Sequence, residues 1–295
     1  MDSRALVDYA LKPFRERDFT YGRYVGFLDR LRSDERHHIV PLRDFHGAPR
    51  DGRVLFGLRH DVDVDAASAL EMAKLERARR LRATYFVLHT APYYALVSRG
   101  VVCRRRQVLD FMRRLQDLGH EVGLHNDLVT LQGIYGVDAL AYAKEELAWL
   151  RGEGVDIVGV AAHGSEYCLR YGYHNQYFFA ELADEERAGF PNRELVRTEA
   201  GAFRIQRGSL RALGFAYDAS HLGNDHHFSD LPGADGRRWH PDELPWHRFQ
   251  PGERVIVLTH PVHWGGSLPK YGRMATRFVR NRLQRLRGSR GRGKL

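Results

Sequence analysis

A short apolar run that ends in acidic and imidazole side chains recurs along this sequence, and it constrains the fold more than any other feature. The first run, residues 54–58, is followed at once by Arg59, His60, Asp61 and, two residues on, Asp63. Buried parallel strands are continuous apolar runs, and α/β folds gather functional side chains where such strands leave the core. The sequence therefore predicts an α/β protein with a site at its strand ends.

Strand-like and helix-like segments alternate after this first run. Such alternation predicts parallel strands joined by right-handed crossovers, and therefore a (β/α) barrel, complete or incomplete. No GxGxxG follows the first strand and no GxxxxGK[ST] occurs, which argues against a nucleotide-binding sheet. Further strands are expected at 82–88, 120–127, 157–164, 215–220 and 253–264, helices at 21–31, 66–80, 108–118, 137–152 and 209–213, and a histidine-rich loop at 221–227.

Composition sets the class of protein. The chain has 295 residues, of which 43% are hydrophobic, so it can bury a core without covalent staples. Cys103 and Cys168 are the two cysteines, and they form neither a CxxC pair nor a zinc-finger spacing. With no apolar signal core after Met1 and no run long enough to cross a membrane, the expected location is the cytoplasm.

The formal net charge of +9 is concentrated near the end of the sequence. Residues 271–295 contain eight Arg and one Lys without an acidic residue, and a narrow apolar stripe runs along one helical face between them. We divide the chain into an N-terminal segment with helical stretches (1–50), a barrel domain (51–268) and a basic amphipathic C-terminal helix (269–295). That helix is expected to pack on the domain, and contact with an anionic membrane surface is the alternative. Nucleic acid is not expected as a partner, because no nucleic-acid-binding motif accompanies the charge.

Three of the predicted strands end in residues that bind metals. An Asp and two His from separate strands are what a catalytic mononuclear metal requires, because a fourth position then stays open for water. This mixture of ligands suits Zn²⁺ first, then cobalt, nickel or manganese. Hydrolysis of an amide would also need groups that take up and deliver protons. The side chains available for these steps are His60, Asp63 and His260.

Four motifs, in order, resemble the polysaccharide deacetylase family, which includes chitin and peptidoglycan deacetylases. They are His60-Asp61, the Ala-Thr-Tyr-Phe at 83–86, the Gly-His-Glu-Val-Gly-Leu-His at 119–125 and the Leu-Thr-His at 258–260. The resemblance covers about residues 54–264 and implies a distorted (β/α)7 barrel that removes N-acetyl groups with the help of a metal. The Arg-His-Asp-Val-Asp motif at 59–63 looks like a divergent branch often associated with surface-glycan assembly.

The resemblance also implies a set of metal ligands. It places the family's metal Asp on Asp61 and its first metal His on His125. The second metal His of the family would fall on Val129, which cannot bind a metal. We therefore predict His163, at the end of the next strand, as the third ligand. Asp127 and Asp63 are the alternatives, since each lies two residues from a ligand and so on the same face of its strand.

The catalytic acid and base follow in the same way. The family's acid His falls on His260, and its base Asp falls on His60, which can serve as a base because its unperturbed pKa lies near neutrality. Asp63 is the alternative base. The residues expected to bind substrate are Arg59, Asp127, Tyr217, Asp218 and Trp264.

The sequence thus predicts a metal-dependent hydrolase that removes an N-acyl group, acetyl first, from an amino sugar or glycan intermediate, with one divalent transition metal, Zn²⁺ first. Val129 and His60 motivate an alternative, a catalytically inactive carbohydrate-binding pseudoenzyme. Hydrolysis of another amide or formyl group, and docking of the basic tail on anionic lipid, are further alternatives. The sequence leaves the oligomeric state open.

Overall fold

The computed structural model describes residues 19–231 and 243–265. The first 18 residues of the predicted N-terminal segment and the basic helix expected at 269–295 lie outside these ranges. No helix within them is both long and apolar enough to cross a lipid bilayer.

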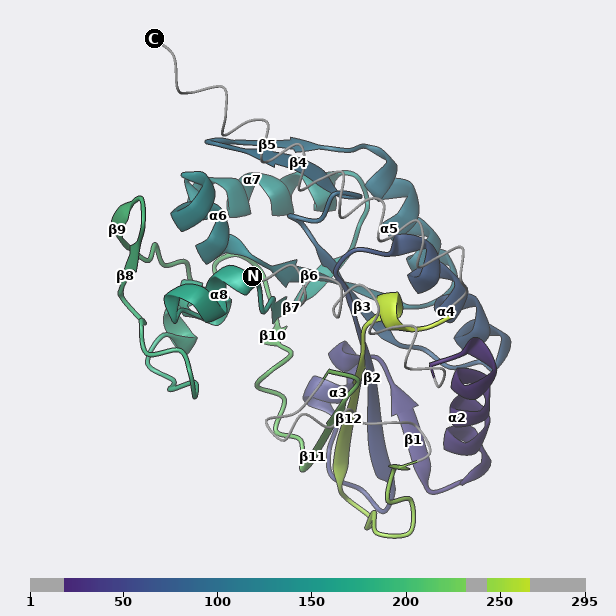
Figure 1. Ribbon diagram of the computed structural model, residues 1–295. Helices are drawn as coiled ribbons and strands as arrows, with labels where there is room; N and C mark the ends of the chain where they lie inside the picture. Colours follow the sequence, from purple (N-terminus) through teal and green to yellow (C-terminus); the bar gives the residue numbers. More distant parts are fainter. Residues whose placement is uncertain (1–18, 232–242, 266–295) are drawn as a thin grey trace, which may run out of the picture.

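The centre of the described structure is one sheet of eight parallel strands. They are β1 (His37–Val40), β2 (Val54–Val62), β3 (Thr84–Leu88), β6 (Glu121–Asn126), β7 (Ile157–Ala162), β10 (Tyr217–Asp218), β11 (His226–Ser229) and β12 (Arg254–Thr259). Seven of them follow one another in the order β10, β7, β6, β3, β2, β12 and β11, and β1 pairs with the first half of β2. The sheet is curved and stays open between β10 and β11 (Figure 1). This topology confirms the prediction of a distorted α/β barrel.

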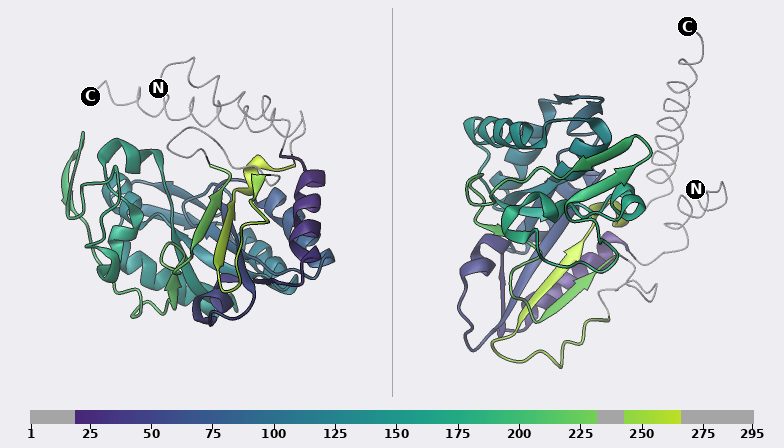
Figure 2. Two further views of the ribbon diagram at one scale, coloured as in Figure 1. Left: turned by 90° about the horizontal axis from the view of Figure 1, so that it is seen from below. Right: turned by 90° about the vertical axis from the view of Figure 1, so that its left-hand side faces the viewer.

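Helices cover the outer side of the sheet, as Figures 1 and 2 show. They are α2 (Tyr21–Ser33), α4 (Ala66–Ala78), α5 (Gln107–Asp117) and α7 (Ala139–Gly152). Each corresponds to a predicted helix. Asp65 and Asp138 fix the starts of α4 and α7, because their carboxylates accept hydrogen bonds from the backbone N–H groups of Ser68 and Ala141.

Strand β2 positions the site, and all nine of its residues are buried. Leu55 belongs to a small apolar cluster with Phe86 of β3 and Ile256 of β12. Leu42 and Phe45 of the short helix α3 (Leu42–Gly47) complete this cluster at the amino-terminal ends of the strands. Since side chains alternate along a strand, Arg59, Asp61 and Asp63 share the face of Leu55. They follow this apolar cluster toward the carboxyl-terminal end of β2.

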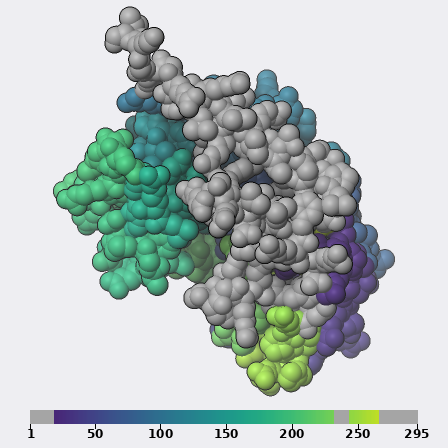
Figure 3. Space-filling view, viewed as in Figure 1, coloured from purple at the N-terminus to yellow at the C-terminus, as the bar shows by residue number. Residues whose placement is uncertain are grey.

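Several elements were not predicted. Among them are two short helices, α6 (Leu128–Tyr135) and α8 (Glu166–Tyr171), and three 3₁₀ helices, η1 (Asn175–Phe178), η2 (Ala180–Leu182) and η4 (Pro261–His263). The described residues also form two hairpins. One pairs β4 (Ala95–Ser98) with β5 (Val101–Arg104), and the other pairs β8 (Leu195–Thr198) with β9 (Gly201–Arg204). The green region around α8 and β9 lies on the side of the molecule opposite the purple helix α2 (Figure 3).

Two predictions of secondary structure were wrong. Residues 209–213 form a turn instead of a helix, because Gly208 and Gly214 flank a segment too short to add a second turn. The histidine-rich loop at 221–227 already enters strand β11 at His226. This strand forms because β12 provides a register of backbone partners from Val255 to Leu258.

Candidate active site

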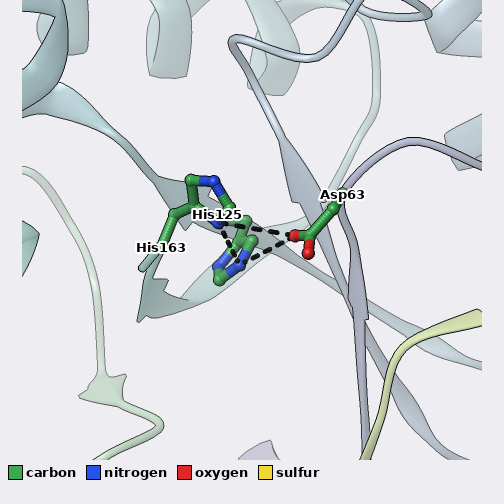
Figure 4. Close-up of side chains that lie close together, drawn as sticks. All are labelled: Asp63, His125 and His163. Atoms are coloured by element: carbon green, nitrogen blue, oxygen red, sulfur yellow. Dashed lines mark hydrogen bonds and ion pairs between the residues drawn. The ribbon is translucent and has the colours of Figure 1, made fainter. Parts of the chain in front are cut away.

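Asp63, His125 and His163 converge at the carboxyl-terminal edge of the sheet (Figure 4). Asp63 Oδ1 lies 3.3 Å from His125 Nε2 and 3.4 Å from His163 Nδ1, and the two imidazole nitrogens are 3.2 Å apart. The side chains of Asp63 and His163 are 25% and 16% exposed, whereas His125 is buried. The three ligand atoms therefore lie around one point, and two of the three side chains are partly exposed.

The fold brings these residues together through the ends of neighbouring strands. Asp63 directly follows β2, His125 lies in β6, and His163 directly follows β7. The backbone N–H of His163 donates to the carbonyl oxygen of Asn126 at 2.8 Å, which joins the ends of β6 and β7. Parallel strands place such residues along a single edge of the sheet, so no long connection is needed to assemble the group.

The donor atoms of this group fit a divalent transition metal. His125 Nδ1 lies 3.0 Å from the carbonyl oxygen of Ala161, so a proton on Nδ1 leaves the lone pair of Nε2 facing the group. Asp63 Oδ1 is buried and accepts no hydrogen bond of good geometry from the described residues. One carboxylate and two imidazoles form a set of three ligands that Zn²⁺ and similar ions accept.

Charges within the group support one another. Burial by itself would raise the pKa of Asp63, but His163 and His125 lower it below the ordinary range of a carboxyl group. Burial would likewise lower the pKa of His125, whereas the carboxylates of Asp61 and Asp63 raise it. The carboxylate of Asp63 is thus ionised at neutral pH, as a metal ligand must be.

Asp61 lies next to this group but has a different partner. Both of its carboxylate oxygens accept hydrogen bonds from Arg59, at 2.8 and 2.7 Å, and Oδ2 is 3.5 Å from His125 Nε2. Both residues are buried, and the guanidinium group of Arg59 lies over the ring of Phe86. Burial alone would raise the pKa of Asp61, but Arg59 and His125 lower it, so its carboxylate is ionised.

His260 is oriented by Asp230, a residue that the sequence analysis did not identify. His260 Nδ1 lies 2.6 Å from Asp230 Oδ1, and the backbone N–H of His260 donates to Oδ2 at 2.7 Å. Burial would lower the pKa of His260, but Asp230, Asp63 and Asp61 raise it to about 9. His260 is therefore protonated at neutral pH, with Nδ1 directed at Asp230 and Nε2 left as the second N–H donor.

Asp230, His260 and His263 form a second group that could in principle hold a metal. Both oxygens of its carboxylate already take part in hydrogen bonds, however. Asp230 Oδ2 accepts hydrogen bonds from the backbone of His260 and from Trp264 Nε1 at 3.0 Å, and it lies 3.3 Å from His263 Nδ1. This carboxylate therefore orients His260 and Trp264.

His60 lies on the other face of β2 from Asp61. Its Nε2 is 2.7 Å from Glu76 Oε1 of α4, and its Nδ1 is 2.6 Å from Thr259 Oγ1. Both ring nitrogens have partners inside the core, where His60 is 1% exposed. The structure therefore separates His60 from the three side chains of the metal-type group.

The residues predicted to bind substrate are all buried. Asp127 accepts hydrogen bonds from Thr90 Oγ1 and Asn175 Nδ2, while Tyr217 donates to Glu121 Oε1. The remaining partners are Ser220 and His221 for Asp218, Asp230 for Trp264, and Asp61 for Arg59. The structure gives each of them a partner within the protein, and it places Arg59 against Asp61 and Trp264 against Asp230.

The fold and this group together define an α/β barrel with a metal-type site at the carboxyl ends of its strands. No protein-family model matches the sequence, and curated proteins give no match. Among solved structures, it is similar to a family 4 carbohydrate esterase from Bacillus anthracis, with 15% identity and a TM-score of 0.32 over 88% of this chain and 86% of the other. It is also similar to a mutant of a CE4 family pseudoenzyme with restored enzymatic activity, with 12% identity and a TM-score of 0.35 over 80% of this chain and 65% of the other.

Both matched structures belong to the polysaccharide deacetylase family that the sequence motifs resemble. Their identities and TM-scores are low, so the matches carry no argument about activity. Function has to be argued from the site itself.

Proposed function

We propose that this protein is a metal-dependent hydrolase that removes an N-acyl group, acetyl first, from an amino sugar or glycan intermediate. The observation that carries the proposal is the convergence of Asp63, His125 and His163, with Nε2 of His125 directed at the ligand atoms of the other two. A divalent metal bound there would supply a Lewis acid for the acyl carbonyl and lower the pKa of water. Zn²⁺ is the first candidate.

This proposal exchanges the parts of Asp61 and Asp63 relative to the sequence-based prediction. Asp63 becomes the carboxylate ligand, because its Oδ1 is within 3.4 Å of both imidazoles. Asp61 becomes the general base, because it is ionised, held in one orientation by Arg59 and adjacent to His125. His60 receives no catalytic part, since Glu76 and Thr259 occupy both of its ring nitrogens.

The protons of the reaction then have defined positions. Asp61 accepts a proton from the water that attacks the acyl carbon. His260, protonated and fixed by Asp230, donates the proton on its Nε2 to the nitrogen of the departing amine. The C–N bond breaks as that N–H bond forms, and the products are the free amine and the carboxylate.

The substrate class comes from the sequence motifs rather than from a visible contact. The residues first expected to bind sugar face partners inside the protein, so the sugar and the acyl group are proposed from the motifs alone. We also propose a reducing, cytoplasmic setting, because Cys103 and Cys168 are both unpaired. Contact of the basic tail with membrane stays a prediction about residues outside the described ranges.

Metal analysis of the purified protein tests the proposal first. We expect about one equivalent of a transition metal in the wild type and a loss of most of it in His125→Ala and His163→Ala. His247→Ala, which removes an exposed imidazole, is the matched control and should keep the metal. A wild type that binds no metal when metal is supplied would remove the basis of the proposal.

A screen of N-acylated sugars for released carboxylate then separates the candidate reactions. Release of acetate that depends on metal and on His125 supports the deacetylase. Release of formate or of another acid instead assigns a different amide substrate. Metal binding without turnover of any N-acyl sugar would support the second candidate, the pseudoenzyme. That candidate is suggested by His60, which replaces the family's base Asp, and by Val129, which replaces one of its metal ligands.

The pH dependence of hydrolysis tests the role of His260. A general acid must be protonated, so activity falls as pH rises through its pKa. Asp230→Asn removes the carboxylate that most strongly raises this pKa. We expect the alkaline limb of kcat/KM against pH to move to lower pH by roughly one to three units. Asp225→Asn, at the opposite end of β11 and paired with Arg50, should leave the limb in place, and an unmoved limb in Asp230→Asn would contradict the assignment.

A further inference from the structure

Asn175 is a fully buried side chain whose amide is saturated with hydrogen bonds. Its Nδ2 donates to the carbonyl oxygen of His163 at 2.8 Å and to Asp127 Oδ1 at 2.9 Å. Its Oδ1 accepts from the backbone N–H groups of Val129 and Thr130, at 3.0 and 3.3 Å. One side chain therefore binds the segment after β6 and the segment after β7 at the same time.

These two segments carry both imidazoles of the proposed metal site. His125 lies in β6 just before the residues that Asn175 contacts, and His163 is itself a partner of Asn175. The backbone carbonyl oxygen of Asn175 also accepts a hydrogen bond from Asn126 Nδ2 at 2.8 Å, which attaches η1 to the residue next to His125. Asn175 thus contacts His163 and the residue next to His125.

Asp127, which follows β6, connects this arrangement to the end of a third strand, β3. Its Oδ2 accepts from Thr90 Oγ1 at 2.8 Å, and its backbone N–H donates to His89 Nε2 at 2.9 Å. His89 and Thr90 directly follow β3, the strand between β2 and β6. A chain of buried hydrogen bonds therefore joins the ends of β3, β6 and β7 behind the ligands.

We propose that Asn175 is the positioning residue that makes His163 the third metal ligand; this inference rests on the proposed metal site. Val129 lies in the first turn of α6, and its side chain cannot bind a metal. Asn175 instead accepts hydrogen bonds from the backbone of that turn, at Val129 and Thr130. The same amide fixes the carbonyl group of His163, the residue that brings the second imidazole from β7. Partners behind a ligand typically change metal affinity by about 10–100-fold when they are removed.

Titration of the metal-free protein with Co²⁺ tests this inference, because visible absorption reports both affinity and ligand geometry. We expect Asn175→Ala to weaken Co²⁺ binding by about tenfold or more and to change the absorption bands. Gln176→Ala is the matched control, since Gln176 is the next buried residue of η1 but its Oε1 accepts from Arg187. It should bind Co²⁺ as the wild type does. Equal losses in both variants would show that only general loosening of η1 is involved, and would overturn the proposal.

A double-mutant cycle gives the decisive readout. If Asn175 acts through His163, His163→Ala combined with Asn175→Ala should bind Co²⁺ no more weakly than His163→Ala alone. Additive losses would overturn the proposal. Asn175→Leu, which nearly keeps the size of the side chain but removes its hydrogen-bonding groups, repeats the test should Asn175→Ala fail to fold.

These outcomes are distinct from those of the proposed function, since no step depends on turnover. Normal Co²⁺ binding by Asn175→Ala refutes the positioning role alone. If the double-mutant cycle gives the expected result but no N-acyl sugar is hydrolysed, only the deacetylase proposal is refuted. A wild type that does not bind Co²⁺ refutes both.

Discussion

Asp61→Asn is expected to keep the metal and to lower hydrolysis by about 10²–10⁴-fold, the usual contribution of a general base. The carboxylate of Asp61 is ionised and held by two hydrogen bonds from Arg59. An asparagine of the same size keeps an oxygen for Arg59, yet it cannot accept a proton. Metal content and kcat on the same preparation measure the two properties separately.

Asp63→Asn, in contrast to Asp61→Asn, should lose the metal itself. Asp63 Oδ1 faces both imidazoles, so replacing the carboxylate by an amide removes the single negative ligand of the site. We expect loss of the metal, and loss of activity as its consequence. Excess metal should restore part of the activity of Asp63→Asn and none of that of Asp61→Asn, because only the former lacks metal.

Asp65→Asn is the control within the same run of alternating acids. Asp65 caps α4 through Ser68, and asparagine caps a helix about as well as aspartate. This variant should keep both metal and activity. If Asp61→Asn loses the metal while Asp63→Asn keeps it, the original assignment of Asp61 as ligand is correct and the exchange proposed here is wrong.

Alternation along β2 explains what the sequence could predict about these acids. Side chains two residues apart share a face of a strand, so Asp61 and Asp63 are expected at one edge, and they lie 3.5 and 3.3 Å from His125 Nε2. Alternation cannot say which of the two binds a metal. In the proposed assignment Arg59 makes the distinction, because it shares their face and pairs with the nearer acid, Asp61. The same rule separates His60 from Asp61, a consequence that the motif resemblance obscured.

Long apolar runs explain why most of the barrel was predictable. The residues of β2, β3 and β12 are all buried, and continuous apolar sequence is the signature of such strands. Strand β11 has only Phe228 as an apolar residue, and it forms by pairing with β12. Asp230 lies directly after β11, so its role was hidden with the strand.

Asn175 shows why the supporting residues could not be found from the sequence. It lies in the long aromatic and polar segment after β7, where nothing in the local pattern marks one amide among many. Its partners at Asp127 and Val129 are more than 40 residues away in the chain. Only the folded structure shows that these contacts meet behind the ligands.

Glu76→Ala is expected to lower the free energy of unfolding by about 3–5 kcal/mol, because it leaves several buried polar groups without their charged partner. Glu76 of α4 is fully buried and accepts hydrogen bonds from the hydroxyl groups of Tyr24 and Tyr85, while His60 Nε2 lies 2.7 Å from Oε1. Removing the carboxylate leaves an imidazole and two hydroxyl groups without their acceptor. Chemical denaturation of both proteins measures the difference.

Glu71→Ala provides the matched control on the same helix. Glu71 is 52% exposed and pairs with Lys74, and exposed pairs of this kind contribute about 0–1 kcal/mol. A loss in Glu76→Ala no larger than that in Glu71→Ala would contradict the structural role given to the His60–Glu76 pair.

Burial alone would raise the pKa of Glu76, but His60 lowers it. The contribution of Glu76 is therefore present at neutral pH and lost as pH falls through that lowered pKa, so wild type and Glu76→Ala should converge in stability on acidification.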